Sequence, residues 1–490
     1  MKICILEDSY AHSQSPLKEL DPPADPLPYL QEHTCERHCL RKATAVQQVI
    51  ELARRDFDLF LNLCDGAWDE DRPGIEVVQA LERLGAPFTG ANAAFYEPSR
   101  EAMKMVCRMW GIQTPAYVMA TADAGVAFAA SHLRFPLIVK HPSSYASIGL
   151  TRHSRVETPA ALHAEAARAI GAYGAALIEE FIEGREFTVL VAENADDARH
   201  PFAYLPVEFQ FAPGESFKHF DLKWKTYATM TCAPCTDAAL SERLQEMARR
   251  LFVGLNGTSY GRCDIRMDAA GELYILEINP NCGIFYPPSA EGSADLILLH
   301  DPRGHAHFVN AILAAARKRS RQAAPKWQLY LDSQQHYGMF AVGAIAEGEV
   351  IAPFEEMAQL LVSRTHVEQN WDADQRAWFA HHAHPLSENV YALWSNLPGG
   401  WQPVRHACDP NAWLTGLNLT ARRPIAAGEE ITIDYATLGA NAMTPFVCTC
   451  GAANCRRLIQ PDDYTQDFVA HYGEHISDYV RTKRSGRVAA

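Results

Sequence analysis

Three features that mark membrane, secreted or nucleic-acid-binding proteins are missing from this sequence of 490 residues. No apolar run reaches the roughly 18 residues that a membrane-spanning helix needs. The first residues, Met1 to Glu7, become acidic too soon for a signal peptide and are typical of a first strand. The net charge is −15, so the chain as a whole does not attract nucleic acid or an anionic membrane surface. We therefore expect a cytoplasmic protein with no nucleic-acid or membrane partner.

The cysteine pattern argues against a disulfide framework. The count of 13 is odd, and most of the cysteines are scattered among segments with the character of a buried core. A reducing environment with one metal site accounts for them better than a set of disulfides. The composition, 48% hydrophobic and 21% charged, is that of a globular protein. The chain is long enough for about three to four domains.

The most informative stretch is residues 261–283. Two strand-like runs, residues 262–267 and 273–279, flank the turn signal at residues 268–271, which predicts a β-hairpin. Because side chains alternate across a strand, the polar groups of each run share a face. These groups are Arg262, Asp264, Glu277 and Asn279. Two carboxylates and an amide oxygen on adjacent strands suit Mg²⁺, whose other positions usually go to water and phosphate. The alternative is an exposed acidic hairpin.

The first 90 residues alternate between strand and helix patterns. Residues 2–6 and 58–63 are apolar runs of strand length, and helix patterns cover residues 44–55 and 74–84. This alternation predicts a parallel sheet that is covered by helices.

The next segment carries cations beside small residues. Ser99 is typical of a helix N-cap, and Arg100 and Lys104 follow on one face of that helix. A buried-looking strand then ends at Lys140 and leads into a loop of small residues that contains Ser147. Such loops expose backbone N–H groups and hydroxyls, and with a nearby ammonium they can fold over a polyphosphate. The alternative for each cation is a solvated surface charge.

Two carboxylates and a further lysine precede the hairpin. Glu179 and Glu186 lie at strand edges, where a carboxylate can accept from an adenine amine or from ribose hydroxyls. Lys223 adds a cation shortly before the hairpin. Ordinary edge charges are the alternative for both glutamates.

The order of these motifs resembles the ATP-grasp superfamily and, within it, the D-alanine–D-alanine ligase branch. The resemblance covers nearly all of residues 1–320 and also includes Asn62 and Thr114-Pro115. It implies an N-terminal α/β domain at residues 1–92 and an ATP-grasp domain with two subdomains at residues 93–320. It also implies ligand-binding roles for the polar residues. The ATP phosphates would be bound by Arg100, Lys104, Lys140, Ser147 and Lys223, the adenine amine by Glu179 and the ribose by Glu186. Mg²⁺ would be bound by Asp264, Glu277 and Asn279, and the oxyanion of the reaction would be stabilised by Arg262.

The chemistry that the resemblance implies is the ATP-dependent joining of a carboxylate to an amine through an acyl phosphate. Catalysis would then rest on positioning and charge stabilisation. The sequence departs from the family in three places. Arg100 replaces a phosphate-binding lysine, Ala146 replaces one of two serines before the loop glycine, and residues 7–12 replace the substrate-binding glutamate motif. We therefore expect a ligase without assigning D-alanine as its substrate.

The secondary-structure pattern of the sequence changes after a basic helix end at residues 314–325. Many short strand and turn patterns follow, with a helical insert that contains Trp371 and Trp378. The strongest local motif is Cys448-Thr-Cys450-Gly-Ala-Ala-Asn-Cys455. Three thiols this close together suit Zn²⁺, and a fourth is available at Cys408. Incidental thiols or a disulfide are the alternative.

These features resemble a SET-domain lysine methyltransferase with a post-SET zinc loop. The motifs that carry the resemblance are residues 337–341, 406–411, 428–435 and the cysteine triplet. The resemblance implies S-adenosylmethionine near Tyr337, Gly338 and His406, with Tyr435 in the active site. It also implies that residues 405–411 and 428–435 thread as a pseudoknot, and that zinc is bound by Cys408, Cys448, Cys450 and Cys455. Two positions depart from the family: Arg405 replaces an asparagine and His336 replaces a glycine.

The sequence therefore predicts a multidomain α/β and α+β protein with two enzymes in one chain. The ATP-grasp part precedes a β-rich SET domain at residues 326–445, a zinc loop at 446–460, and a C-terminal helix with a basic tail at 461–490. The expected substrates are amino acids or small peptides for the ligase and a lysine-containing acceptor for the methyltransferase. Two alternatives stay open: a methyltransferase with a non-catalytic nucleotide-binding module, and a ligase with an inactive, peptide-binding SET domain.

Overall fold

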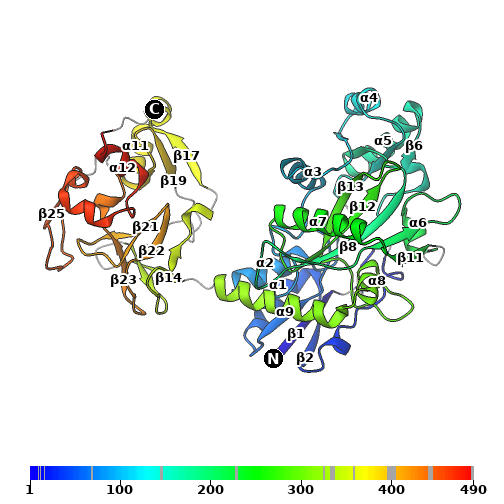
Figure 1. The fold of residues 1–490 in the computed structure, drawn as a ribbon, viewed down its shortest axis with the longest axis horizontal. Helices are drawn as coiled ribbons and strands as arrows, with labels where there is room; N and C mark the ends of the chain where they lie inside the picture. The colour runs from blue at the N-terminus through cyan, green and yellow to red at the C-terminus, as the bar shows by residue number, and fades with distance from the viewer. Residues whose placement is uncertain are drawn as a thin grey trace. The chain divides into compact units, whose positions relative to one another are not determined.

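The computed structural model describes residues 1–8, 10, 13–15, 17–67, 70–143, 147–226, 230–323, 326–331, 337–356, 359–393, 404–439 and 445–486. The chain forms two compact units, Met1–Ala324 and Pro325–Ala490, and each is described by itself (Figure 1). Ala146 and His336, two of the positions that depart from the family patterns, lie outside the described residues. None of the helices within these ranges is long and apolar enough to cross a membrane.

The first unit begins with a three-stranded parallel sheet in the order β2-β1-β3. Its central strand is buried on both faces, because Cys4 and Leu6 pack into one core cluster while Ile3 and Ile5 pack into another. The predicted parallel sheet with covering helices is confirmed for this part of the chain. Its elements are β1 Lys2–Asp8, β2 Thr34–Leu40, α1 Ala45–Ala53, β3 Leu59–Asn62 and α2 Ile75–Arg83.

A second sheet has four strands in the order β4-β7-β5-β6, and every pairing in it is antiparallel. Two helices cover one face, where Val126 of α4 and Leu162 of α5 pack against Val139 and Ile178 of the sheet. The elements of this subdomain are α3 Arg100–Met109, β4 Tyr117–Ala120, α4 Asp123–His132, β5 Leu137–Lys140, β6 Arg155–Val156, α5 Pro159–Tyr173 and β7 Ala176–Glu180.

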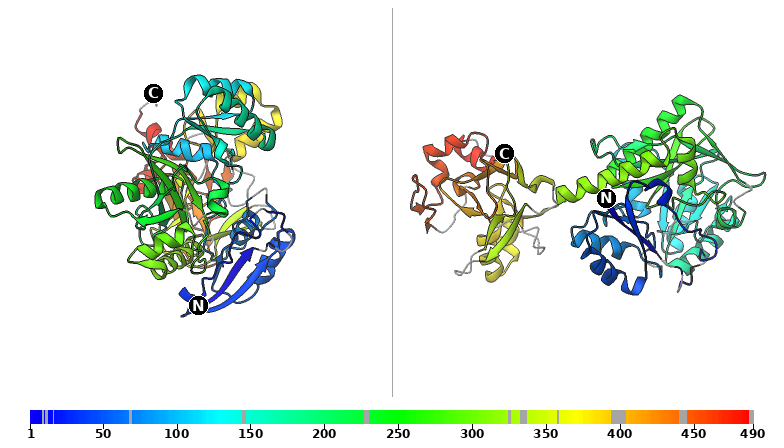
Figure 2. Two further views of the ribbon diagram at one scale, coloured as in Figure 1. Left: turned by 90° about the vertical axis from the view of Figure 1, so that its right-hand side faces the viewer. Right: turned by 90° about the horizontal axis from the view of Figure 1, so that it is seen from below.

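The third sheet follows the order β11-β10-β8-β12-β13, and β9 also pairs with β8. Helices cover both of its faces: Val189 of β8 faces the cluster that contains α7, whereas the next residue, Leu190, faces the cluster that contains α8 and α9 (Figures 1 and 2). The elements are β8 Arg185–Ala192, β9 Phe202–Ala203, β10 Val207–Gln210, α6 Phe220–Trp224, β11 Thr231–Pro234, α7 Ala238–Gly254, β12 Tyr260–Met267, β13 Leu273–Pro280, α8 Ser293–His300 and α9 Gly304–Ala323.

The second unit consists of small sheets, some of which share an apolar cluster that includes Met339, Ile351, Leu414 and Ile431. The sheets follow the orders β14-β15-β23-β20, β16-β22-β21, β17-β19-β18 and β24-β25. The strands are β14 Trp327–Leu331, β15 Tyr337–Ala341, β16 Val350–Ala352, β17 Leu360–Ser363, β18 His384–Pro385, β19 Val390–Leu393, β20 Arg405–His406, β21 Ala412–Thr415, β22 Asn418–Ala421, β23 Glu430–Ile433, β24 Phe446–Val447 and β25 Leu458–Ile459. The helices are α10 Arg364–Asn370, α11 Ala373–His382 and α12 Asp478–Arg484.

Candidate functional sites

The hairpin of β12 and β13 forms the centre of the first site. The antiparallel register pairs Arg262 with Asn279 and Asp264 with Glu277, so the predicted hairpin is confirmed. Asp264 accepts hydrogen bonds from the Arg262 guanidinium at 3.1 Å and from the Asn279 amide at 3.3 Å. A bulge follows at Leu276, because Asp264 pairs with Glu277 whereas the next residue of β12 pairs with Ile275. Leu276 and Glu277 therefore both line the same cavity.

The charges at this hairpin are strongly coupled. Burial raises the pKa of Asp264, but Arg262 and Lys218 outweigh burial and lower the pKa to about 2. Burial also lowers the pKa of Lys223, and the nearby Arg262 guanidinium adds to the effect, so that this pKa falls to about 8. The Asp264 carboxylate is therefore ionised at neutral pH and, together with Glu277, offers hard oxygen ligands of the kind that Mg²⁺ prefers.

Helix α3 brings two cations toward the hairpin and toward β7. It begins after Ser99, whose hydroxyl accepts from the backbone N–H of Ala102 as the predicted N-cap does. Arg100 forms an ion pair with Glu277. One turn later, Lys104 lies 2.6 Å from a carboxylate oxygen of Glu179.

Glu179 lies between two lysines. Lys140 contacts its second carboxylate oxygen, also at 2.6 Å, and the Glu179 side chain is completely buried. Burial raises the pKa of Glu179, but Lys104 and Lys140 together lower it to about 2. The residue predicted to face an adenine amine is therefore, in this structure, the shared counter-ion of two predicted phosphate ligands.

Glu186 has two cationic partners that the sequence analysis missed. Arg266 donates to one of its oxygens at 2.9 Å, and Lys218 lies 3.0 Å from the other. Arg266 is two residues beyond Asp264 on β12, so the alternation of the strand could have identified it. Lys218 lies in a loop, and no sequence pattern pointed to it. Ser147 contacts the same loop, because its hydroxyl donates to the backbone carbonyl of Lys218 at 2.8 Å.

Two cavities meet at the hairpin. The smaller cavity, of about 100 Å³, is lined by Lys140, Glu179 and Glu186, and the larger cleft, of about 850 Å³, extends to residues 17–23 and 281–293. Four predicted site residues line both cavities: Lys223, Arg262, Glu277 and Asn279. One set of charged groups therefore faces both spaces.

A buried arginine organises the far end of the larger cleft. Arg72 is 2% exposed and lies 2.5 to 2.7 Å from the carboxylates of Asp8, Asp65 and Glu70. Burial lowers the pKa of Arg72, but the nearby Asp65 carboxylate raises it by more, so the Arg72 guanidinium stays charged. Asp8 belongs to the stretch that departs from the ligase pattern, and Asp65 follows Asn62. No sequence pattern pointed to Arg72, because its ion pair with Asp8 joins positions 64 residues apart.

An aspartate bridges the walls of the same cleft. Asp21 accepts hydrogen bonds from the hydroxyls of Tyr10 and Tyr286, both at 2.7 Å. Tyr286 lies so close to Gly283 that a side chain at position 283 would collide with the phenol. The loop after β13 and the segment after β1 are thereby joined, and they define the shape of the space beyond the hairpin.

In the second unit, β20 and β23 bring the two predicted threading segments together. They pair in parallel, with Arg405 beside Thr432 and His406 beside Ile433. The backbone N–H of Tyr435 donates to Nδ1 of His406 at 3.2 Å, and the Tyr435 hydroxyl donates to the carbonyl of Val404 at 2.9 Å. Burial raises the pKa of Tyr435 to about 12, so the phenol is neutral at physiological pH.

The strand predicted to bind the methyl donor contacts an ion pair. Arg405 pairs with Glu430, and a Cβ atom at Gly338 would lie 2.9 Å from the Glu430 carboxylate and 3.3 Å from Nε of Arg405. Arg405, one of the two positions that depart from the SET pattern, therefore lies close to Gly338 and directly precedes His406. Tyr337, at the start of β15, is 41% exposed.

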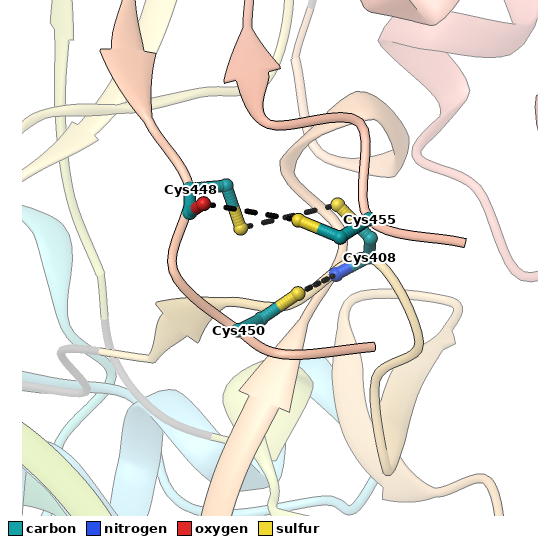
Figure 3. Close-up of side chains that lie close together, drawn as sticks. All are labelled: Cys408, Cys448, Cys450 and Cys455. Atoms are coloured by element: carbon teal, nitrogen blue, oxygen red, sulfur yellow. Dashed lines mark hydrogen bonds between the residues drawn. The ribbon is translucent and has the colours of Figure 1, made fainter. Parts of the chain in front are cut away.

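The four predicted zinc ligands come together. The sulfur atoms of Cys408, Cys448, Cys450 and Cys455 all lie within 4.8 Å of one another. Figure 3 shows these side chains pointing toward a common centre. The backbone N–H of Cys408 donates to the Cys450 sulfur at 3.5 Å, and the backbone N–H of Arg456 donates to the Cys408 sulfur at 3.3 Å. A closed set of four soft thiol ligands fits a structural Zn²⁺ ion.

The fold and the hairpin site define the first unit as an ATP-grasp protein. Residues 106–287 match the family model described as D-ala D-ala ligase C-terminus, and residues 336–436 match the SET domain model. The D-alanine–D-alanine ligase of Marinomonas sp. (strain MWYL1) is 30% identical over 247 residues, which cover 49% of this chain and 73% of that enzyme. The corresponding ligase of Hydrogenovibrio crunogenus is 29% identical over 242 residues, which cover 48% of this chain and 71% of that enzyme.

A solved structure agrees with this classification. The D-alanine–D-alanine ligase from Bacillus anthracis complexed with ATP superposes with a TM-score of 0.50 and 19% identity, covering 66% of this chain and 98% of that one. This likeness shows the ATP-grasp fold. The chain belongs to the D-alanine–D-alanine ligase family, and its second unit carries a SET domain.

Proposed function

We propose that the first unit is an ATP-dependent carboxylate–amine ligase. The observation that carries the proposal is that Lys223, Arg262, Glu277 and Asn279 line both cavities. A nucleotide in the smaller cavity and an acceptor in the larger cleft would therefore meet at one charged wall. Such a wall can bring the γ-phosphate and a carboxylate together, which is the main task of an enzyme that works by positioning.

The charged residues divide the work of the reaction. Asp264, Glu277 and Asn279 would hold Mg²⁺, which neutralises phosphate charge when it is bound. A carboxylate oxygen of the substrate attacks the γ-phosphorus of ATP and ADP leaves, which gives an acyl phosphate. An amine nitrogen then attacks the carbonyl carbon, loses a proton, and expels phosphate as the new C–N bond forms. Arg262, held by Asp264, would stabilise the oxyanion of that second step.

The acceptors that we propose are amino acids or small peptides, and D-alanine is one candidate among them. The larger cleft carries cations near the hairpin, whereas at its far end the carboxylates of Asp21 and Asp65 outnumber the buried cation there, Arg72. A zwitterionic substrate matches this separation of charge, because its carboxylate is attracted to one end and its ammonium to the other.

The test of ligase activity is phosphate release from Mg²⁺ and ATP in the presence of an amino-acid panel. Glu277→Gln should abolish release, because it removes a metal ligand and the partner of Arg100. Glu272→Gln is the matched control, since Glu272 is an exposed residue at the turn end of the same hairpin. Silence across a broad panel, with ATP still bound, would instead favour a non-catalytic nucleotide-binding module.

We also propose that the SET domain transfers a methyl group from S-adenosylmethionine to a lysine-containing acceptor. The support is the match to the SET model together with the paired threading segments, partly buried Tyr435 and the four-cysteine cluster. Tyr435 would orient a neutral amine for in-line attack on the methyl carbon. The methyl–sulfur bond then breaks, S-adenosylhomocysteine leaves as the neutral thioether, and the methylated ammonium loses a proton. The cysteines would bind Zn²⁺ as a structural ion.

A second possibility for this unit is an inactive SET domain that binds peptides. The Arg405–Glu430 ion pair against Gly338 favours it, because charged groups stand where the methyl donor is predicted. Calorimetry with S-adenosylmethionine separates the two, since a methyltransferase must bind the donor. If the donor binds, transfer of a labelled methyl group to a lysine-containing peptide should follow, and Tyr435→Phe should reduce its rate. Glu277→Gln should leave methyl transfer unchanged.

A further inference from the structure

We infer that Arg456 is a positioning residue that couples the four-cysteine cluster to Tyr435. The inference rests on the proposed methyltransferase function of the SET domain. It assigns to Arg456, and to His406 beside it, the task of holding the backbone around Tyr435 in place when the cysteine loop is ordered.

The first connection is an ion pair across the domain. Both guanidinium Nη atoms of Arg456 donate to the Asp434 carboxylate at 2.7 Å, one to each oxygen. Asp434 is completely buried and directly precedes Tyr435. Parallel two-point pairing of this kind fixes orientation as well as distance. The position of residue 434 is therefore tied to residue 456.

The Asp434 carboxylate in turn organises the turn that contains Tyr435. It accepts from the backbone N–H of Ala436 at 3.0 Å and from the hydroxyl of Tyr472 at 3.1 Å. Without Arg456, the buried Asp434 carboxylate would keep these two neutral hydrogen-bond donors among the described residues. A buried anion without its counter-ion is costly, so the turn would rearrange toward water.

The second connection runs through an imidazole. The backbone N–H of Tyr435 donates to Nδ1 of His406, so Nε2 carries the proton of the neutral ring. Nε2 lies 3.3 Å from the Cys408 sulfur, in position to donate to it. One ring therefore joins a cysteine of the cluster to the Tyr435 backbone.

Both connections begin at the cysteines. Arg456 follows Cys455 directly, and its own backbone N–H donates to the Cys408 sulfur at 3.3 Å. The side-chain amide of Asn454 donates to the backbone carbonyl of Cys408 at 3.1 Å. Any ion that holds Cys408 and Cys455 together therefore also holds the backbone of residue 456 beside Asp434.

The experiment measures amide hydrogen exchange over residues 430–439 in the full chain, with zinc content determined on the same samples. Removing zinc from the wild-type protein with a chelator should raise exchange in this segment at least tenfold. Arg456→Met should raise it by a similar factor while zinc stays bound, and should weaken S-adenosylmethionine binding. The matched control is Arg457→Met, because Arg457 is the neighbouring residue and is exposed.

Two results would overturn the coupling. One is zinc-bound Arg456→Met protein whose exchange over residues 430–439 equals that of Arg457→Met. The other is wild-type protein whose exchange in this segment does not change on zinc removal, a result that decides the question even if Arg456→Met fails to fold. Absence of methyl transfer by the wild-type protein, with the exchange effects intact, would refute the methyltransferase proposal and leave the coupling in place.

Discussion

Replacing Glu179 by glutamine tests the electrostatic design of the predicted nucleotide site. The carboxylate is completely buried and lies 2.6 Å from both Lys104 and Lys140. These lysines lower its pKa from 4.5 to about 2 in spite of burial. At about 1.4 kcal/mol per pH unit, the shift corresponds to about 3 kcal/mol of stability at pH 7. Glu179→Gln should remove this stabilisation, because two buried ammonium groups lose their counter-ion.

Thermal unfolding of the full chain measures the effect. At about 2 °C per kcal/mol for a unit of this size, the midpoint of the first unit should fall by about 6 °C at pH 7. The carboxylate's contribution is complete above pH 4.5 and is lost as the pH falls toward 2, so the difference from wild type should drop below half by about pH 3. Glu183→Gln is the control, since Glu183 forms an ion pair while its side chain is 65% exposed. A midpoint equal to that of the control, or a difference that is independent of pH, would refute the reasoning.

Three further predictions concern the other charged groups. Because the pKa of Lys223 is about 8, ATP binding at pH 9 should be accompanied by the uptake of a proton. Calorimetry in buffers of different ionisation enthalpy should detect this proton uptake in wild type and in the control Lys225→Met, whose ammonium is exposed. Proton uptake that persists in Lys223→Met would contradict the prediction. Arg72→Met should destabilise the protein by about 3 kcal/mol or more at pH 7, since three carboxylates lose their counter-ion, and equal thermal midpoints for variant and wild type would contradict this. Metal analysis should find about one zinc per chain, lost in Cys450→Ser, and full retention there would exclude Cys450 as a ligand.

The sequence predicted those parts of the ligase site that depend on local pattern. Alternation along β12 and β13 places Arg262, Asp264, Glu277 and Asn279 together, and the observed register agrees. The same alternation could have added Arg266. Patterns of this kind cannot show which strands become neighbours, and β7 and β8, though consecutive, belong to different sheets.

The residues that sequence reasoning missed are those whose partners are distant in the chain. Arg72 contacts Asp8 across 64 positions, and Lys218 reaches Glu186 from a loop with no periodic signal. In the second unit, the sequence predicted a cluster of three closely spaced cysteines with Cys408 as the fourth member, and the structure brings all four sulfur atoms together. The ion pair between Arg456 and Asp434 depends on tertiary packing, so no local pattern indicates it.

The most direct test of the ligase proposal is an isotope-transfer measurement. The protein is incubated with Mg²⁺, ATP and an accepted amino acid whose carboxylate carries ¹⁸O. If the carboxylate attacks the γ-phosphorus, one ¹⁸O atom must pass into the released phosphate as the C–N bond forms, and mass spectrometry should find singly labelled phosphate in step with product. Unlabelled phosphate accompanying product would contradict an acyl phosphate and, with it, the proposed reaction.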